Sequence, residues 1–159
     1  MKFVQNIESK NIAKKIASWK YPSPYDIYSM NGDKETIKEI LNEDYYSYIY
    51  DDLIIGYFCY GDPAQVPTDN PEIYDDDEYL DIGVGLNPKL CGEGRGFNFF
   101  SKAVDTAFEI YEIKKYRLTV AEFNERAIKV YMKYGFRKEN EFQRNKNGQK
   151  TNFITMTFN

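Results

Sequence analysis

A short glycine-rich loop between a predicted strand and a predicted helix constrains this chain more than any other feature. Residues 87–96 read Asn-Pro-Lys-Leu-Cys-Gly-Glu-Gly-Arg-Gly; the apolar run 79–86 before them is typical of a strand, and the stripe of apolar residues in 97–111 indicates an amphipathic helix. Glycine lacks a Cβ atom and adopts positive φ, so this loop can bend sharply and point several backbone N–H groups at one place. The helix that begins there adds the positive end of its dipole, and the two features predict an anion site suited to a pyrophosphate.

The loop matches neither of the two commonest nucleotide-binding motifs. A Walker loop ends in Gly-Lys-Ser/Thr, which is missing here, and a dinucleotide-binding fingerprint reads G-x-G-x-x-G, whereas this loop reads G-x-G-x-G. The preceding strand is also late in the chain instead of first. We therefore expect another phosphate-bearing ligand.

The rest of the chain alternates between helical and strand patterns. Helical spacing of apolar residues predicts helices over 11–19, 33–41, 97–111 and 124–134, with Asp33 and Asn124 as caps and Gly135 ending the last helix. Alternation and β-branched or aromatic residues predict strands over 45–50, 53–60, 79–86, 116–121, 136–142 and 151–158. Between them we expect a tight turn at 51–52, a loop over 61–78 and a turn over 145–148. This order predicts one α/β (or α+β) domain spanning 1–159.

Composition excludes several classes of chemistry. The chain has no histidine, which rules out every mechanism that uses a histidine base and removes the commonest zinc ligand. Two cysteines without metal-ligand spacing predict neither a disulfide framework nor a metal site. The net charge of −4, with no basic face, argues against a nucleic-acid partner, and no apolar run is long enough to span a membrane. Without a secretory signal, we expect a cytoplasmic protein.

A second motif follows the loop by about thirty residues. Residues 124–136 read Asn-Glu-Arg-Ala-Ile-Lys-Val-Tyr-Met-Lys-Tyr-Gly-Phe. Seven residues make about two helical turns, so Asn124 and Tyr131 lie on nearly the same helix face, roughly 10 Å apart. A tyrosine, with a pKa of about 10, can donate a proton to a leaving thiolate whose conjugate acid has a pKa of about 8.5. The alternative is that Tyr131 is an ordinary core aromatic.

Together the two motifs resemble those of the GCN5-related N-acetyltransferase (GNAT) family. Residues 91–96 match its coenzyme A loop, Gln/Arg-x-x-Gly-x-Gly/Ala, except that Cys91 replaces the first residue, and residues 124–136 match its Asn-x-x-Ala-Ile-x-x-Tyr-x-x-x-Gly-Phe signature. The resemblance is clear over 79–136. It implies a mixed, mostly antiparallel central sheet that is flanked by helices and splays to admit acetyl-CoA. It also implies direct acetyl transfer to an amine, with coenzyme A as the product and no metal.

The resemblance also implies which residues contact the cofactor and which move protons. Tyr131 takes the general-acid role. In some relatives a glutamate on the strand before Asn124 acts as the base, but the matching residue here is Thr119, so the candidate bases are Asp81 first and Glu122 second. The implied cofactor contacts are Val84, Gly85, Leu86, Cys91, Gly92, Glu93, Gly94, Arg95, Gly96, Phe97, Asn124 and Tyr131.

The sequence leaves the acceptor and the assembly open. The stretch 72–81 contains six acidic residues and no basic one, which either steers a cationic acceptor amine or is simply a solvated loop. The oligomeric state is left open, with a homodimer as one option. The main alternative function is a non-catalytic module that binds an acyl-coenzyme A, and a second is an unrelated nucleotide-binding domain.

Overall fold

The computed structural model describes residues 1–159 and contains one seven-stranded mixed sheet with the strand order β1-β2-β3-β4-β5-β7-β6. β4 and β5 are parallel, whereas the pairs β1–β2, β2–β3, β5–β7 and β6–β7 are antiparallel. The predicted α/β class and the mostly antiparallel sheet are thus confirmed. The strands are β1 (Lys2–Asn6), β2 (Tyr45–Tyr50), β3 (Leu53–Tyr60), β4 (Leu80–Leu86), β5 (Tyr116–Ala121), β6 (Arg137–Lys146) and β7 (Gln149–Phe158). The helices are α1 (Lys10–Ala17), α2 (Lys34–Ile40), α3 (Gly96–Tyr111) and α4 (Glu125–Tyr134), with short 3-10 turns η1 (Tyr25–Tyr28), η2 (Asp62–Ala64), η3 (Pro71–Tyr74) and η4 (Pro88–Leu90).

The chain forms two compact units, which β4 links because it begins in one and ends in the other. The first unit comprises 1–59 and 84–95, and the second comprises 60–83 and 96–159.

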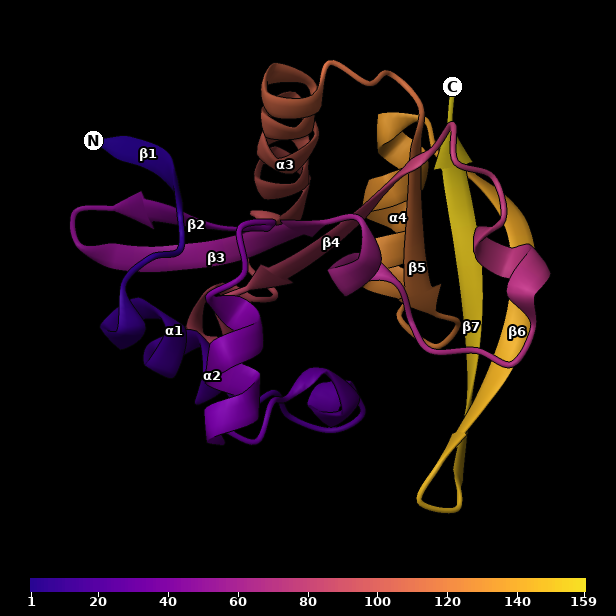
Figure 1. Cartoon of the computed structure of the whole chain (residues 1–159), viewed down its shortest axis with the longest axis horizontal. Coiled ribbons are helices and arrows are strands. Elements are labelled where there is room, and N and C mark those ends of the chain that lie inside the picture. The colour runs from indigo at the N-terminus through magenta and orange to yellow at the C-terminus, as the bar shows by residue number, and fades with distance from the viewer. The chain divides into compact units, whose positions relative to one another are not determined.

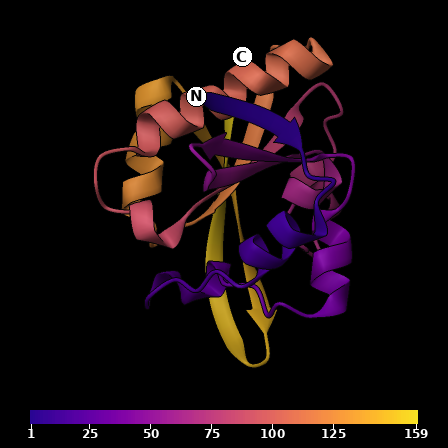
Figure 2. The same ribbon diagram turned by 90° about the vertical axis from the view of Figure 1, so that its left-hand side faces the viewer.

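The first unit is built on the antiparallel strands β1, β2 and β3, with α1 and α2 lying next to each other (Figures 1 and 2). Ser9 caps α1 by accepting the Ile12 N–H, and α1 buries Ala13, Ile16 and Ala17 on one side. Asp33 caps α2 by accepting the Thr36 N–H at 2.8 Å, as predicted. The tight turn expected between β2 and β3 forms at Asp51 and Asp52, both at positive φ.

In the second unit, α3 packs against α4, and β5, β7 and β6 form one antiparallel section of the sheet. An aromatic cluster joins the helices to the sheet. The Tyr134 ring of α4 contacts Phe100 of α3, Phe158 of β7, and Phe136, which lies between α4 and β6, with ring centroids 5.4–5.8 Å apart. Figure 1 shows β6 and β7 as a long hairpin that extends well past the other strands of this unit. Gly135 ends α4 at a φ of 122°, as its position predicted.

Apart from shifts of one or two residues at the ends of elements, the structure differs from the predicted elements in three places. β1 was not predicted, because its five residues carry little apolar alternation and it is held only as an edge strand against β2. β6 and β7 are longer than predicted, since their turn needs only Asn147 and Gly148, both at positive φ. The predicted loop 61–78 contains the turns η2 and η3.

Candidate functional site

The glycine loop starts from a buried side chain that anchors the end of β4. The Asn87 amide group donates to the Ile54 carbonyl at 2.9 Å, and its oxygen accepts the Lys89 N–H at 3.0 Å, which starts η4. Gly92 and Gly94 then adopt φ values of 77° and 76°, the left-handed region that an L residue enters only at a cost. The prediction that these glycines permit positive φ is confirmed. The anchoring role of Asn87 was missed, because an asparagine before proline reads only as a turn residue.

Side chains on the loop are exposed and leave its backbone uncovered. Residues 92–95 are all exposed, and Glu93 forms an ion pair with Arg95. Cys91 is half-buried, with its Sγ 3.6 Å from the Asn87 carbonyl oxygen. The chain continues directly into α3 at Gly96, one residue earlier than predicted.

The C-terminal half of β4 is more exposed than its central place in the sheet suggests. Residues 83–86 are only half-buried. A Cβ atom on Gly85 would lie 2.0 Å from the Tyr57 ring, so the glycine is needed to accommodate that ring. The Tyr21 hydroxyl donates to the Leu86 carbonyl at 2.7 Å, and burial, followed by the nearby Cys91, raises the pKa of this phenol.

In the second unit, α4 presents both residues of the signature motif. Asn124 caps the helix by accepting the Ala127 N–H at 3.3 Å, so its predicted capping role is confirmed. The Tyr131 ring packs on Phe100, one turn into α3, with ring centroids 4.7 Å apart. A Cβ atom on Gly96 would lie 3.3 Å from Val130, so α3 begins close against α4. No residue of α4 is fully buried, although the helix is amphipathic.

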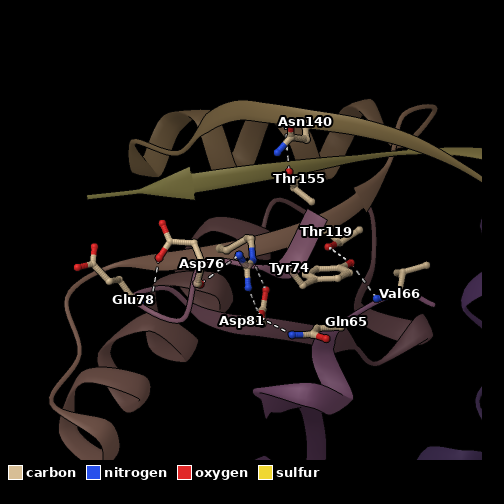
Figure 3. Close-up of polar contacts among 10 residues, drawn as sticks. Gln65, Val66, Tyr74, Asp76, Glu78, Asp81, Thr119, Asn140 and Thr155 are labelled. Atoms are coloured by element: carbon tan, nitrogen blue, oxygen red, sulfur yellow. Dashed lines mark hydrogen bonds and ion pairs between the residues drawn. The ribbon is translucent and has the colours of Figure 1, made fainter. Parts of the chain in front are cut away.

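Asp81 is held by a buried ion pair. Its two carboxylate oxygens accept hydrogen bonds from the Arg117 guanidinium at 2.6 and 2.7 Å, and Gln65 donates a third at 2.9 Å (Figure 3). Both ionic side chains are only 5% exposed. Burial alone would lower the pKa of Arg117, but its hydrogen bonds to Asp81 and the charge of Asp81 outweigh burial and raise it. The Asp81 carboxylate is therefore committed to a permanent cation, which disfavours it as a base.

Glu122 lies directly after β5 and is exposed. Its backbone N–H donates to the Asn152 carbonyl at 2.8 Å. Its side chain lines a cavity of about 330 Å³ together with Glu141, Phe142, Gln143 and Asn152. Of the two carboxylates that the sequence singled out, this one remains accessible.

A hydroxyl pair that the sequence did not single out lies on β5. The Tyr74 hydroxyl is 2.7 Å from the Thr119 hydroxyl and accepts the Val66 N–H at 2.9 Å (Figure 3). The Tyr74 ring covers the Arg117 guanidinium at 5.1 Å. No local pattern marks a single tyrosine in an acidic loop as a partner of a strand 45 residues away.

The β4–β5 ladder is short, and Thr119 lies beyond its end. The two strands pair only at Leu80–Tyr116 and Asp81–Arg117. The next residues of β5 continue to pair with β7 on the other edge. Thr119 is two residues past the last β4 partner.

β4, the glycine loop, α3, β5 and α4 follow one another along the chain and carry the two sequence motifs, with α3 packed against α4. The model of the Acetyltransferase (GNAT) family matches residues 13–136, which include β4, the loop, α3 and α4. The chain belongs to this family. The match favours an enzyme over the non-catalytic alternative. The search of curated proteins found no match to the chain.

Solved structures of low sequence identity share the fold. Mutant forms of the spermidine/spermine N-acetyltransferase SpeG from Vibrio cholerae superpose with a TM-score of 0.68 at 16% identity, covering 99% of this chain and 94% of that one. A putative phosphinothricin N-acetyltransferase gives a TM-score of 0.73 at 13% identity, with 99% and 97% covered. The putative acetyltransferase yncA from Salmonella typhimurium, solved with its cofactor acetyl-CoA, gives 0.65 at 13% identity, with 99% and 92% covered.

Proposed function

We propose that this protein is an N-acetyltransferase that moves the acetyl group of acetyl-CoA directly to a primary amine. The observation that carries the proposal is the loop 92–95, an exposed backbone with two glycines at positive φ that runs straight into the first turn of α3. Exposed amides at a helix start suit a diphosphate. None of the helices has the length and apolar composition of a membrane span. We include in the proposal that the reaction needs no metal and takes place in the cytoplasm.

The proposed cofactor contacts come from several segments. Residues 91–97 would hold the diphosphate through backbone amides, so the replacement of the motif's Gln or Arg by Cys91 would leave this grip intact. The backbone of 84–86 would pair with the pantetheine arm; the half-burial of these residues supports this, although the Leu86 carbonyl already accepts the Tyr21 hydroxyl. Asn124 and Tyr131 of α4 are also proposed cofactor contacts. The lack of any fully buried residue in α4 agrees with a ligand covering this helix.

The proposed chemistry moves two protons. The amine nitrogen bonds to the acetyl carbon and gives a proton to a base, directly or through water, and the C–S bond breaks as Tyr131 protonates the leaving thiolate. For the base we favour Glu122 over Asp81, because the Asp81 carboxylate is saturated by Arg117 and Gln65.

The acidic segment favours a cationic acceptor. Glu72, Asp75, Asp76 and Asp77 are exposed and form no ion pair, whereas Glu78 pairs with Lys115 at 2.8 Å. Four exposed carboxylates on one segment attract an ammonium ion. The amine acceptor of the spermidine/spermine N-acetyltransferase is of this chemical kind.

An amine panel tests the proposal directly. The protein would be mixed with acetyl-CoA and spermidine, phosphinothricin, lysine or a peptide with a free N-terminus, and release of free thiol would be followed. We expect thiol release that depends on at least one amine. No release with any amine, together with no heat of acetyl-CoA binding in calorimetry, would contradict the proposal.

The Tyr131→Phe variant tests the general acid. We expect kcat to fall about 100-fold or more, because the thiolate then leaves without a positioned proton donor. Tyr134→Phe is the matched control, since this ring lies on the same helix inside the aromatic cluster and should keep its activity. Equal turnover by the wild type and Tyr131→Phe would remove Tyr131 from the mechanism.

A further inference from the structure

The Tyr74–Thr119 pair contains one O–H group for which the protein provides no hydrogen-bond acceptor. Two hydroxyl groups bring two protons, and the 2.7 Å contact between them uses one. The remaining interaction of the pair is the Val66 N–H, which is itself a donor. Neither hydroxyl has another partner in the protein. One O–H of the pair is therefore left to donate to something that is not part of the chain.

Relative acidity assigns the free O–H to Thr119. A phenol is more acidic than an alcohol, so Tyr74 is the better donor within the pair, and its oxygen is already accepting the Val66 N–H. Burial, as the largest influence, raises the pKa of Tyr74, so the phenol keeps its proton at neutral and mildly alkaline pH. A hydroxyl that accepts a hydrogen bond becomes a stronger donor through its own proton.

The Tyr74 ring is itself in contact with two other side chains. The Arg117 guanidinium carbon lies over the ring, 5.1 Å from its centroid, and the Phe142 ring meets it in a T-shaped contact with centroids 6.4 Å apart. The half-buried positions of Tyr74 and Thr119 leave the pair accessible. Thr119 also lies past the end of the β4–β5 ladder, on the strand that leads into α4.

We propose that the Thr119 hydroxyl donates a hydrogen bond to the carbonyl oxygen of the acetyl group as the amine attacks, and that Tyr74 positions this hydroxyl. Negative charge builds on that oxygen in the transition state, where a preorganised neutral donor is most effective. Donation to the amine instead would occupy the lone pair that must attack. No proton is transferred in this step: Thr119 is a catalytic residue through its hydrogen bond, and Tyr74 is a positioning residue.

This inference rests on the proposed acetyl transfer and is tested with four variants and the amine that reacts best in the panel. Thr119→Val removes the hydroxyl at almost constant shape, and we expect kcat to fall about 100-fold with an unchanged Kd for acetyl-CoA. Thr119→Ser restores the hydroxyl and should recover most of the activity. Tyr74→Phe should lower kcat about tenfold, and adding it to Thr119→Val should cost nothing more, because the two act as a unit.

Tyr79→Phe is the matched control. Its hydroxyl donates to Asn159 from the same segment of chain, so its loss should leave kcat unchanged. A higher KM for the amine at constant kcat in Thr119→Val would overturn the inference and assign the pair to amine binding. A lower melting temperature with normal kinetics would overturn it in favour of a structural role. A wild type that releases no thiol removes the proposed function itself, and this inference with it.

Discussion

At the scale of single residues, two similar carboxylates have very different environments. The sequence offers both Asp81 and Glu122 as candidate bases. In the structure Asp81 is buried against Arg117, whereas Glu122 is exposed beside a cavity. A buried pair that loses one partner leaves an unpaired charge inside the protein, which is far more costly than losing an exposed carboxylate.

Asp81→Asn and Glu122→Gln should therefore affect different properties, the first the stability of the fold and the second the activity. We expect Asp81→Asn to lower the free energy of unfolding by about 3–5 kcal/mol, since the Arg117 charge stays buried without its partner. Glu122→Gln should leave unfolding nearly unchanged but lower kcat/KM, most clearly at a pH where the acceptor is largely protonated. Urea unfolding and thiol-release kinetics measure both. A stable Asp81→Asn variant that has lost its activity would restore Asp81 as the base.

At the scale of elements, the loop between β4 and α3 combines a left-handed backbone conformation with exposure to solvent. Gly92 and Gly94 turn the backbone through the left-handed region, and the side chains around them are exposed. A Cβ atom on Gly94 would meet nothing within 4 Å, so a larger residue there is strained by its backbone and not by crowding.

Gly94→Ala should weaken cofactor binding. Alanine at a φ of 76° costs about 1 kcal/mol, so the loop shifts away from the conformation that holds the diphosphate. We expect the Kd for acetyl-CoA to rise severalfold in calorimetry. Gly148→Ala is the control, because it has a similar φ of 81° and equally open space in the β6–β7 turn. Equal Kd values for the two variants would show that the loop does not grip the cofactor.

At the scale of the whole molecule, binding of the proposed cofactor is linked to the stability of the folded protein. A ligand that binds only the folded protein stabilises it by mass action, whatever the details of its contacts.

Acetyl-CoA should accordingly raise the melting temperature. At a concentration of about 100 times Kd the gain is about 2.7 kcal/mol, which corresponds to roughly 5–10 °C for a chain of this size. NAD and ATP should give much smaller shifts, because the loop lacks both of their common motifs. Differential scanning fluorimetry with the three ligands checks this. A larger shift with NAD or ATP would point to a different nucleotide.

The sequence alone determined the main helices and strands, the glycine loop and the helix caps at Asp33 and Asn124, because periodicity, capping and turn chemistry act over a few neighbouring residues. Two short motifs at a set spacing also sufficed to indicate the family. Only the tertiary structure decided what Asp81 does, since its partner Arg117 is 36 residues away. It likewise decided that Tyr74 meets Thr119, because contacts between distant segments depend on how the whole sheet and its loops pack.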